Sequence, residues 1–267
     1  MVSNKIIEIV EQRKQSLVND IRFNNLLRRK TLRDDRKTLS EAIKANKGIS
    51  IISEIKPASP TLGDIRRNID VEELAMEMQR SGVIGLSILT EPNYFHGSYE
   101  NLKYAVECTK IPCLMKDFII DSVQFFIAYK LGATNILIIN SIRDFKLEEL
   151  VYTAYEYRLE PLIEIHDLEE IEDIKHLVEI GLPPKLVGVN NRNLKTLEID
   201  LNTSKKIIPK LKEEFGDDIV IISESGINSF ADIKFLLSYK ADGFLIGSSI
   251  MKSPNIKEKI LELRGDC

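Results

Sequence analysis

The chain has 267 residues, of which 43% are hydrophobic and 29% are charged, and its formal net charge is −4. This composition is that of a globular protein and excludes a largely disordered chain, while the negative charge argues against nucleic acid or an anionic membrane as a partner. The three cysteines have no metal-ligand spacing, no apolar run approaches the roughly 20 residues of a membrane span, and the first residues lack a signal-peptide pattern, so we expect a cytoplasmic protein with free thiols.

The first 48 residues predict helix and no strand. Residues 4–46 carry apolar side chains near helical spacing amid charged ones, and read as helix throughout, with a second helix at about Leu39–Ala45. This segment is too short to hold a good core of its own. We therefore expect residues 1–48 to form a helical extension that packs on the domain that follows.

From Ile49 onward, a short apolar run followed by an amphipathic helix is repeated eight times. The runs are apolar throughout instead of alternating with polar residues, which is typical of a parallel sheet covered by helices. Eight such units in about 250 residues favour a closed barrel over an open sheet. The sequence thus predicts an α/β fold, a single (β/α)8 TIM barrel within one domain over residues 1–267. The runs span residues 49–55, 83–89, 112–116, 133–140, 161–165, 186–190, 219–223 and 242–247.

Polar residues interrupt these runs at their C-terminal ends, where barrel enzymes place their catalytic side chains. Glu54 and Lys56 are two positions apart, so both side chains should point into the barrel, where charge must be paired or used. The set could also be an ion-pair network that merely plugs the barrel mouth. Its convergence on one rim favours an active site. The other members of the set are Lys116, Glu164, Asn190, Arg192 and Glu224.

Glycine turns follow the last two runs: Ser225 and Gly226 after the seventh, Gly247 and Ser248 after the eighth. Backbone N–H groups in such turns receive anions, and the loops after strands 7 and 8 are the common phosphate site of this fold. We therefore predict a phosphorylated small-molecule substrate. No residue cluster has metal spacing, so we predict no metal, and no GxGxxG motif follows the first run, which argues against a dinucleotide.

The three histidines are weaker candidates. His96 lies in the loop after the second run, where it could touch substrate but is more simply a surface residue. We interpret His166 and His176 as structural.

Seven blocks in register, from about Ile49 to the C-terminus, resemble the indole-3-glycerol-phosphate synthase family, which also carries extra helices before its first strand. Any one block alone would be weak, whereas seven in order are specific. The blocks are ISEIKPASP (52–60), SILTEPNYFHGS (87–98), CLMKDFIID (113–121), LIEIHD (162–167), VGVNNRNLKTLEID (187–200), ISESGI (222–227) and FLIGSSIM (244–251).

The resemblance implies a reaction of tryptophan biosynthesis. The family converts 1-(2-carboxyphenylamino)-1-deoxyribulose 5-phosphate to indole-3-glycerol phosphate, carbon dioxide and water, without a cofactor. It implies that Lys116 is the general acid, that Lys56 assists dehydration, and that Glu164 and Glu54 serve in proton transfer and stabilise the cationic intermediate. We expect nearby cations and burial to lower the pKa of the acid lysine.

The resemblance also implies a binding shell around these groups. We count Asn190 with the catalytic residues. Around them the resemblance implies a polar shell, a phosphate-binding backbone and an apolar wall for the aromatic ring of the substrate. The members are Ser59, Arg192, Glu224 and Ser225 in the polar shell; Gly226, Gly247 and Ser248 at the phosphate; and Phe95, Phe118 and Leu194 in the wall.

Two positions depart from the family pattern. Pro57 follows Lys56 where many relatives carry a basic or polar residue, and His96 stands where Asn, Gln or Gly is expected. Proline removes an N–H and stiffens the backbone. Neither change removes a catalytic residue, so they bear on loop behaviour and rate and not on the type of reaction.

Three other functions compete with this interpretation. Phosphoribosylanthranilate isomerase is another phosphate-binding barrel, whose chemistry resembles that of a Cys/Asp acid–base pair with the cysteine on the first strand. This chain has Glu54 and Lys56 on that strand and no cysteine. A Schiff-base aldolase would use Lys116 or Lys56 and would be trapped by borohydride. A non-catalytic barrel need not keep these charged residues together at one mouth. We expect a monomer that acts on a small phosphorylated molecule and binds neither nucleic acid nor membrane.

Overall fold

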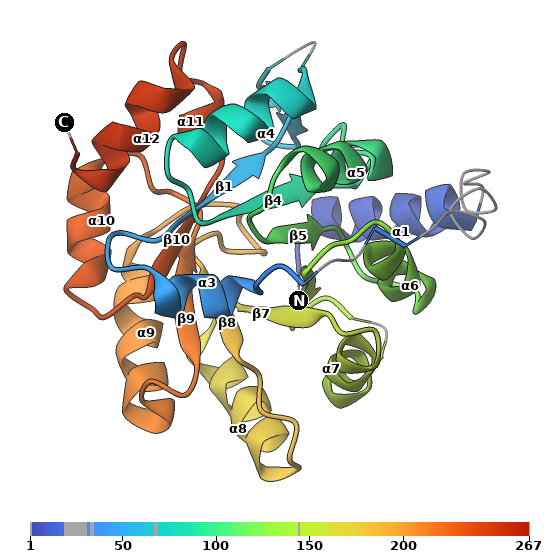
Figure 1. The fold of residues 1–267 in the computed structure, drawn as a ribbon. Coiled ribbons are helices and arrows are strands. Elements are labelled where there is room, and N and C mark those ends of the chain that lie inside the picture. Colours follow the sequence, from blue (N-terminus) through green and yellow to red (C-terminus); the bar gives the residue numbers. More distant parts are fainter. Residues whose placement is uncertain (1, 19–30, 33–34, 67–68, 144, 267) are drawn as a thin grey trace.

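Eight parallel strands close into a barrel in the computed structural model, which describes residues 2–266 except 19–30, 33–34, 67–68 and 144. The strands pair in chain order, and the last, β10, pairs with β1 (Figure 1). This closed barrel confirms the predicted fold class, and each predicted run corresponds to one strand. The strands are β1 (Ile51–Ile55), β4 (Gly85–Leu89), β5 (Cys113–Lys116), β6 (Asn135–Ile139), β7 (Glu160–Ile165), β8 (Leu186–Asn190), β9 (Val220–Glu224) and β10 (Gly243–Ile246).

Helices surround the barrel and bury their apolar faces against the outer side of the strands (Figure 1). Among the described helices, none is long and apolar enough to cross a membrane. The sequence did not predict the short hairpin of β2 (Ala58–Ser59) and β3 (Gly63–Asp64), nor the short α11 (Ser248–Met251). The other helices are α4 (Val71–Arg80), α5 (Tyr99–Cys108), α6 (Val123–Lys130), α7 (Leu147–Glu156), the 3-10 helix η1 (Leu168–Glu170) with α8 (Ile171–Glu179), α9 (Asn202–Phe215), α10 (Phe230–Leu237) and α12 (Ile256–Arg264).

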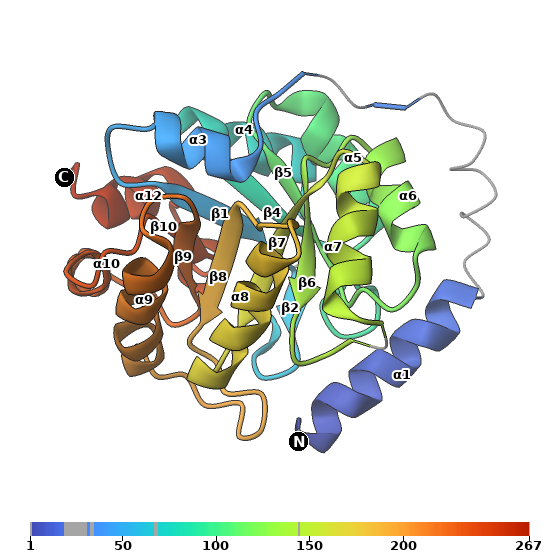
Figure 2. The ribbon, with the colours of Figure 1, turned by 90° about the horizontal axis from the view of Figure 1, so that it is seen from below.

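The N-terminal segment forms two helices, α1 (Asn4–Val18) and α3 (Leu39–Ala45), at opposite ends of the barrel (Figure 2). The prediction of helix throughout residues 4–46 is wrong for 31–32 and 35–38, which are not helical; residues 19–30 and 33–34 lie outside the described residues. Thr38 explains the break, because it is extended and forms a capping box with Glu41, so a new helix begins after it.

Helix α3 closes the bottom of the barrel. Leu39 is fully buried and joins the apolar side chains that fill the barrel interior. Glu160, at the start of β7, fixes this helix: its Oε1 accepts hydrogen bonds from the Ser40 N–H at 3.0 Å and from Asn135 Nδ2 at 2.7 Å, and its Oε2 accepts from the hydroxyls of Thr38 and Ser40. The polar residues at the C-terminal ends of the strands therefore lie at the opposite end of the barrel, its mouth.

Candidate active site

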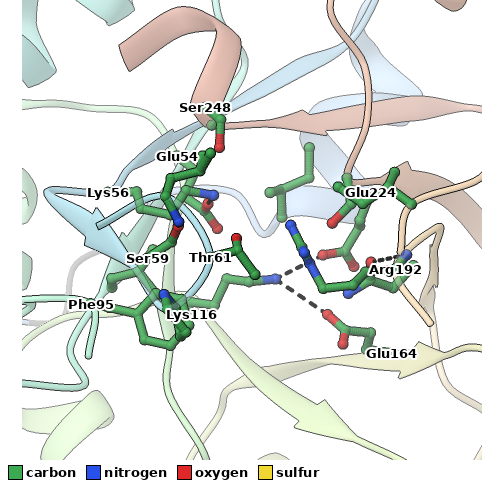
Figure 3. A pocket seen from close by; sticks show the side chains of 18 of the residues that line it. Glu54, Lys56, Ser59, Thr61, Phe95, Lys116, Glu164, Arg192, Glu224 and Ser248 are labelled. Carbon is green, nitrogen blue, oxygen red and sulfur yellow. Dashed lines mark hydrogen bonds and ion pairs between the residues drawn. The ribbon is translucent and has the colours of Figure 1, made fainter. Parts of the chain in front are cut away.

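A cavity of about 520 Å³ opens at the C-terminal mouth of the barrel, and every predicted site residue lines it (Figure 3). The structure thus brings together residues from the ends of five strands, β1, β5, β7, β8 and β9, and from the loops that follow these strands, β4 and β10. Their roles stay predictions. The predicted residues that line the cavity are Lys116, Lys56, Glu164, Glu54, Asn190, Ser59, Phe95, Phe118, Arg192, Leu194, Glu224, Ser225, Gly226, Gly247 and Ser248.

Lys116, the last residue of β5, points across the cavity at two glutamates (Figure 3). Its Nζ donates to Glu224 Oε2 at 2.8 Å and to Glu164 Oε2 at 3.3 Å. Burial by itself would lower the pKa of the Lys116 ammonium, but attraction by Glu224, Glu164 and Glu54 outweighs it and raises the pKa above its usual range. The predicted lowering of this pKa is therefore wrong, because the nearest charges are anions and not cations.

Glu54 and Lys56 form the second charged group, on β1 and the residue after it. Their side chains point the same way, as predicted, and Lys56 Nζ donates to Glu54 Oε1 at 2.6 Å. Burial would raise the pKa of Glu54, but Lys56 and Lys116 together hold it below its usual value. Gly247 makes room for this pair: a Cβ there would lie 2.5 Å from Glu54 Oε1 and 3.1 Å from Lys56 Nζ.

Glu164 and Glu224 are both buried, yet their surroundings shift their pKa values in opposite directions. For Glu164, burial is outweighed by Lys116, His166 and Asn190, which hold its pKa far below the usual range. For Glu224, burial and the charges of Glu164 and Glu54 outweigh Lys116 and raise its pKa to about 7. A site that separates two carboxyl pKa values in this way can keep one group ionised while the other carries a proton.

His166 lies beside Glu164, a contact that the sequence did not predict. Its Nε2 is 3.2 Å from Glu164 Oε1, and the side chain is almost entirely buried. Burial would lower the pKa of His166, but Glu164, Glu170 and Glu224 outweigh it and raise the pKa. Residues 164 and 166 are two positions apart, so alternation alone would put them on one side, but His166 lies just beyond the end of β7 and was interpreted as structural. His96, in contrast, lies outside the cavity lining and faces Asp64, with 3.3 Å between Nδ1 and Oδ1.

The hairpin after β1 carries further lining residues, and Pro57 shapes its base. The Pro57 carbonyl accepts hydrogen bonds from the N–H groups of Ile65 at 2.8 Å and Arg66 at 3.1 Å, so the loop returns to its start. Ser59 and Thr61 lie on this hairpin and face the cavity (Figure 3). Pro57 itself is not among the residues that line the cavity, and its carbonyl bonds would be open to any residue at this position.

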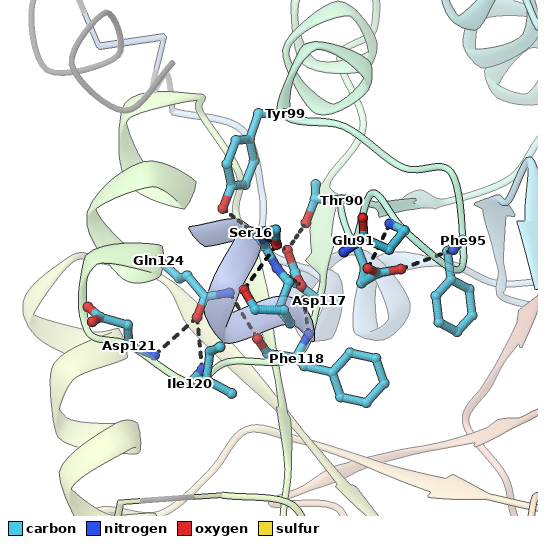
Figure 4. Close-up of polar contacts among 12 residues, drawn as sticks. Ser16, Thr90, Glu91, Phe95, Tyr99, Asp117, Phe118, Ile120, Asp121 and Gln124 are labelled. Atoms are coloured by element: carbon cyan, nitrogen blue, oxygen red, sulfur yellow. Dashed lines mark hydrogen bonds and ion pairs between the residues drawn. The ribbon is translucent and has the colours of Figure 1, made fainter. Parts of the chain in front are cut away.

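The apolar wall is held by two buried side chains (Figure 4). The Glu91 carboxylate accepts hydrogen bonds from three consecutive backbone N–H groups, those of residues 93–95, and so fixes the loop that carries Phe95. Gln124 on α6 does the same for the loop after β5, where its Nε2 donates to the Phe118 carbonyl at 2.9 Å. The rings of Phe95 and Phe118 lie 6.4 Å apart, centroid to centroid. Sequence reasoning missed Glu91, although it lies only two residues after the end of β4.

Helix α1 also lines the cavity, through Lys5, Ile6 and Ile9. The N–H of Ser3 donates to the Leu194 carbonyl at 2.8 Å, which ties the start of the chain to the loop after β8. The sequence offered no signal for these residues, because their placement depends on how α1 packs. Among the described residues, no group of three His, Cys, Asp or Glu side chains is placed to hold a metal ion; the lack of a cofactor stays a prediction.

The raised pKa of Glu224 predicts a stability effect that depends on pH. Between about 4.5 and about 7, the unfolded chain has lost the Glu224 proton while the folded protein keeps it, so the folded state loses relative stability as the pH rises through this window. Glu224→Gln, which is neutral at every pH, should match the wild type near pH 5 and melt several degrees higher near pH 8. Calorimetry at both pH values measures this. A variant that melts lower than the wild type at pH 8 would contradict the assignment.

Comparisons with known proteins agree with this site. The family profile described as indole-3-glycerol phosphate synthase matches residues 1–263. Relatives carrying that name include proteins of Methanocaldococcus jannaschii, 42% identical over 97% of this chain and 94% of the relative, and of Nautilia profundicola, 38% identical over 99% of both. A thiamine phosphate pyrophosphorylase from Pyrococcus furiosus shares the fold alone, with a TM-score of 0.59 and 17% identity over 82% of this chain and 95% of that one. The chain therefore belongs to the indole-3-glycerol phosphate synthase family, whose members are carboxy-lyases of tryptophan biosynthesis.

Proposed function

We propose that the cavity at the barrel mouth converts 1-(2-carboxyphenylamino)-1-deoxyribulose 5-phosphate to indole-3-glycerol phosphate, carbon dioxide and water. The observation that carries this proposal is the partly buried, protonated Lys116 held between Glu164 and Glu224, beside an aromatic wall and the Glu54–Lys56 pair. This arrangement combines an acid, anionic groups that favour a cationic intermediate, and a pocket for a flat ring.

The substrate is flexible, and its two ends must be brought together before the ring can close. We place its phosphate at the turns of Ser225–Gly226 and Gly247–Ser248, where backbone N–H groups suit an anion and the two glycines carry no side chain. We place its aromatic ring against Phe95, Phe118 and Leu194. Binding at both ends holds the substrate in the folded conformer that ring closure needs, so the entropy cost of reaching this conformer is met on binding.

Ring closure needs an acid at the keto group. The ring carbon that bears the carboxylate attacks the keto carbon, and Lys116 donates its proton to the oxygen as the carbon–carbon bond forms. The raised pKa of Lys116 keeps it protonated until that oxygen becomes strongly basic. The intermediate carries positive charge on the nitrogen side, which ionised Glu164 and Glu54 stabilise.

Two losses complete the reaction. The carboxylate leaves as carbon dioxide, and its bonding electrons return to the ring and neutralise the cation. The hydroxyl formed from the keto oxygen then leaves as water, with a proton from Lys56, while a carboxylate accepts the proton from the adjacent carbon. Asn190, Arg192, Ser59 and Glu224 hold the polar parts of the substrate during these steps.

We also propose that the protein acts as a monomer in the cytoplasm. Cys108 and Cys113 are unpaired thiols, and burial raises the pKa of Cys113 to about 11, so it stays an unreactive thiol. Such thiols suit a reducing compartment.

The test supplies the carboxyphenylamino substrate to the purified chain and follows the appearance of indole fluorescence. We expect turnover without an added cofactor. Borohydride added with substrate should trap no adduct; a trapped lysine adduct would favour the aldolase. The same preparation should sediment as one chain of 30.5 kDa. Absence of product, or a stable dimer, would overturn the corresponding part of the proposal.

A further inference from the structure

Gly188 lies in the middle of β8 with its side-chain position facing the barrel interior. Leu186 belongs to the apolar cluster inside the barrel, and alternation along the strand puts residues 188 and 190 on the same side. The register places Gly188 opposite Glu164 on β7 and Asn190 opposite Glu224 on β9. At the level of Glu164, β8 therefore contributes no side chain to the interior.

The carboxyl group of Glu224 occupies the space that this glycine leaves. A Cβ built on Gly188 would overlap Glu224 Oε1 and lie 3.1 Å from both Glu224 Cδ and Leu162 Cδ1. Oε1 is buried and has no hydrogen-bond partner among the described residues, whereas Oε2 accepts the hydrogen bond from Lys116. Oε1 of the Glu224 carboxyl group thus points into the barrel interior, and Oε2 accepts the hydrogen bond from Lys116.

We propose that Gly188 is a positioning residue, which sets the depth of the Glu224 carboxyl group and through it the alignment of Lys116. The inference rests on the proposed roles of Glu224 and Lys116. A methyl group at residue 188 would push the carboxyl group toward the mouth, into the space of the substrate, because Leu162 closes the side of the same space. Displacements of about 1 Å in a site of this kind can cost about 10²-fold in rate.

Gly188→Ala tests this directly. Gly188 has no positive φ, and alanine is tolerated in strands, so the variant should fold and melt close to the wild type. We expect kcat/KM to fall by about 10²-fold. The matched control is Gly243→Ala, on β10, where a Cβ would lie 3.3 Å from Ile222, Ile43 and Ser50 and meets no lining residue. It should keep the wild-type kcat/KM. A fully active Gly188→Ala enzyme would overturn the inference.

A double variant separates positioning of Glu224 from general loosening of the barrel. Aspartate is one methylene shorter, so Glu224→Asp should lose activity alone but fit above the methyl group of Gly188→Ala. The double variant should therefore be more active than the product of the two single losses. Losses that simply multiply would contradict the inference.

Glu224→Gln distinguishes this inference from the proposed function. If Glu224→Gln is inactive while Gly188→Ala is fully active, the role of Glu224 stands and the positioning by Gly188 fails. If Glu224→Gln is fully active, both the role of Glu224 and the inference fail.

Discussion

Lys116→Ala should abolish turnover nearly completely. The ammonium of Lys116 is the only cation within hydrogen-bond distance of both Glu164 and Glu224 among the described residues, and we propose that it protonates the keto oxygen. Loss of a positioned general acid costs about 10²–10⁴-fold, and the loss of its charge beside the developing oxyanion adds to that. The measurement is kcat and kcat/KM, followed by indole fluorescence. Activity equal to that of the wild type would refute the assignment of Lys116 as the acid.

Folding must be separated from chemistry in this experiment. Removing Lys116 leaves the buried carboxylates without their common partner, and a broken buried pair can cost about 3–5 kcal/mol. Lys116→Arg keeps the charge but places it on a planar fork with another reach, so it should fold and still lose most of its activity. The control is Lys175→Ala, which removes a partly exposed lysine paired with Glu172 and Glu214, outside the cavity lining; its activity should not change.

Arg13→Ala should destabilise the protein more than the removal of any surface charge on the same helix. Arg13 on α1 is 1% exposed, and its Nε and Nη2 donate to the two oxygens of Asp117 at 2.8 and 2.9 Å (Figure 4). Nη2 also donates to the Tyr99 hydroxyl at 2.6 Å. Burial alone would lower the pKa of Arg13, but Asp117 and Tyr99 raise it, so the guanidinium stays charged.

The alanine variant would leave Asp117 buried, and the donors that remain to it among the described residues would be the Thr90 hydroxyl and the Phe118 N–H. We expect a loss of about 3–5 kcal/mol in the free energy of unfolding, measured by urea denaturation. Activity should fall as well, because Asp117 follows Lys116 directly and also lines the cavity.

Two further variants sharpen this test. Lys14→Ala removes the neighbouring exposed pair with Glu11, 3.4 Å long, and should change the midpoint little. Adding Asp117→Asn to Arg13→Ala removes the unpaired charge and should restore part of the lost stability. If Arg13→Ala is no more destabilising than Lys14→Ala, the buried pair does not anchor α1 to the barrel.

The sequence by itself determined the barrel fold and which residues lie at the mouth of the barrel. Continuous apolar runs followed by amphipathic helices are local patterns, and eight of them leave few ways to bury every strand. The residues that end parallel strands must meet at one rim, so Glu54, Lys116, Glu164 and Glu224 could be placed together before any coordinates were known. The second helix begins at Leu39 as predicted, but the residues just before it were read as helix, because the capping residue Thr38 outweighed a continuous helical pattern.

Only the tertiary structure decided the electrostatics and the space within the mouth. The pKa of Lys116 is raised and not lowered because Glu224, Glu164 and Glu54, on other strands, surround it. The distances between side chains on different strands cannot be read from the sequence of either strand. The same holds for α1, whose Arg13 reaches Asp117 across 104 positions of the chain, and for Gly188, whose missing side chain matters only because Glu224 fills its place. Charge interaction and steric fit depend on distances in space, whereas local periodicity fixes only which side of an element each residue faces.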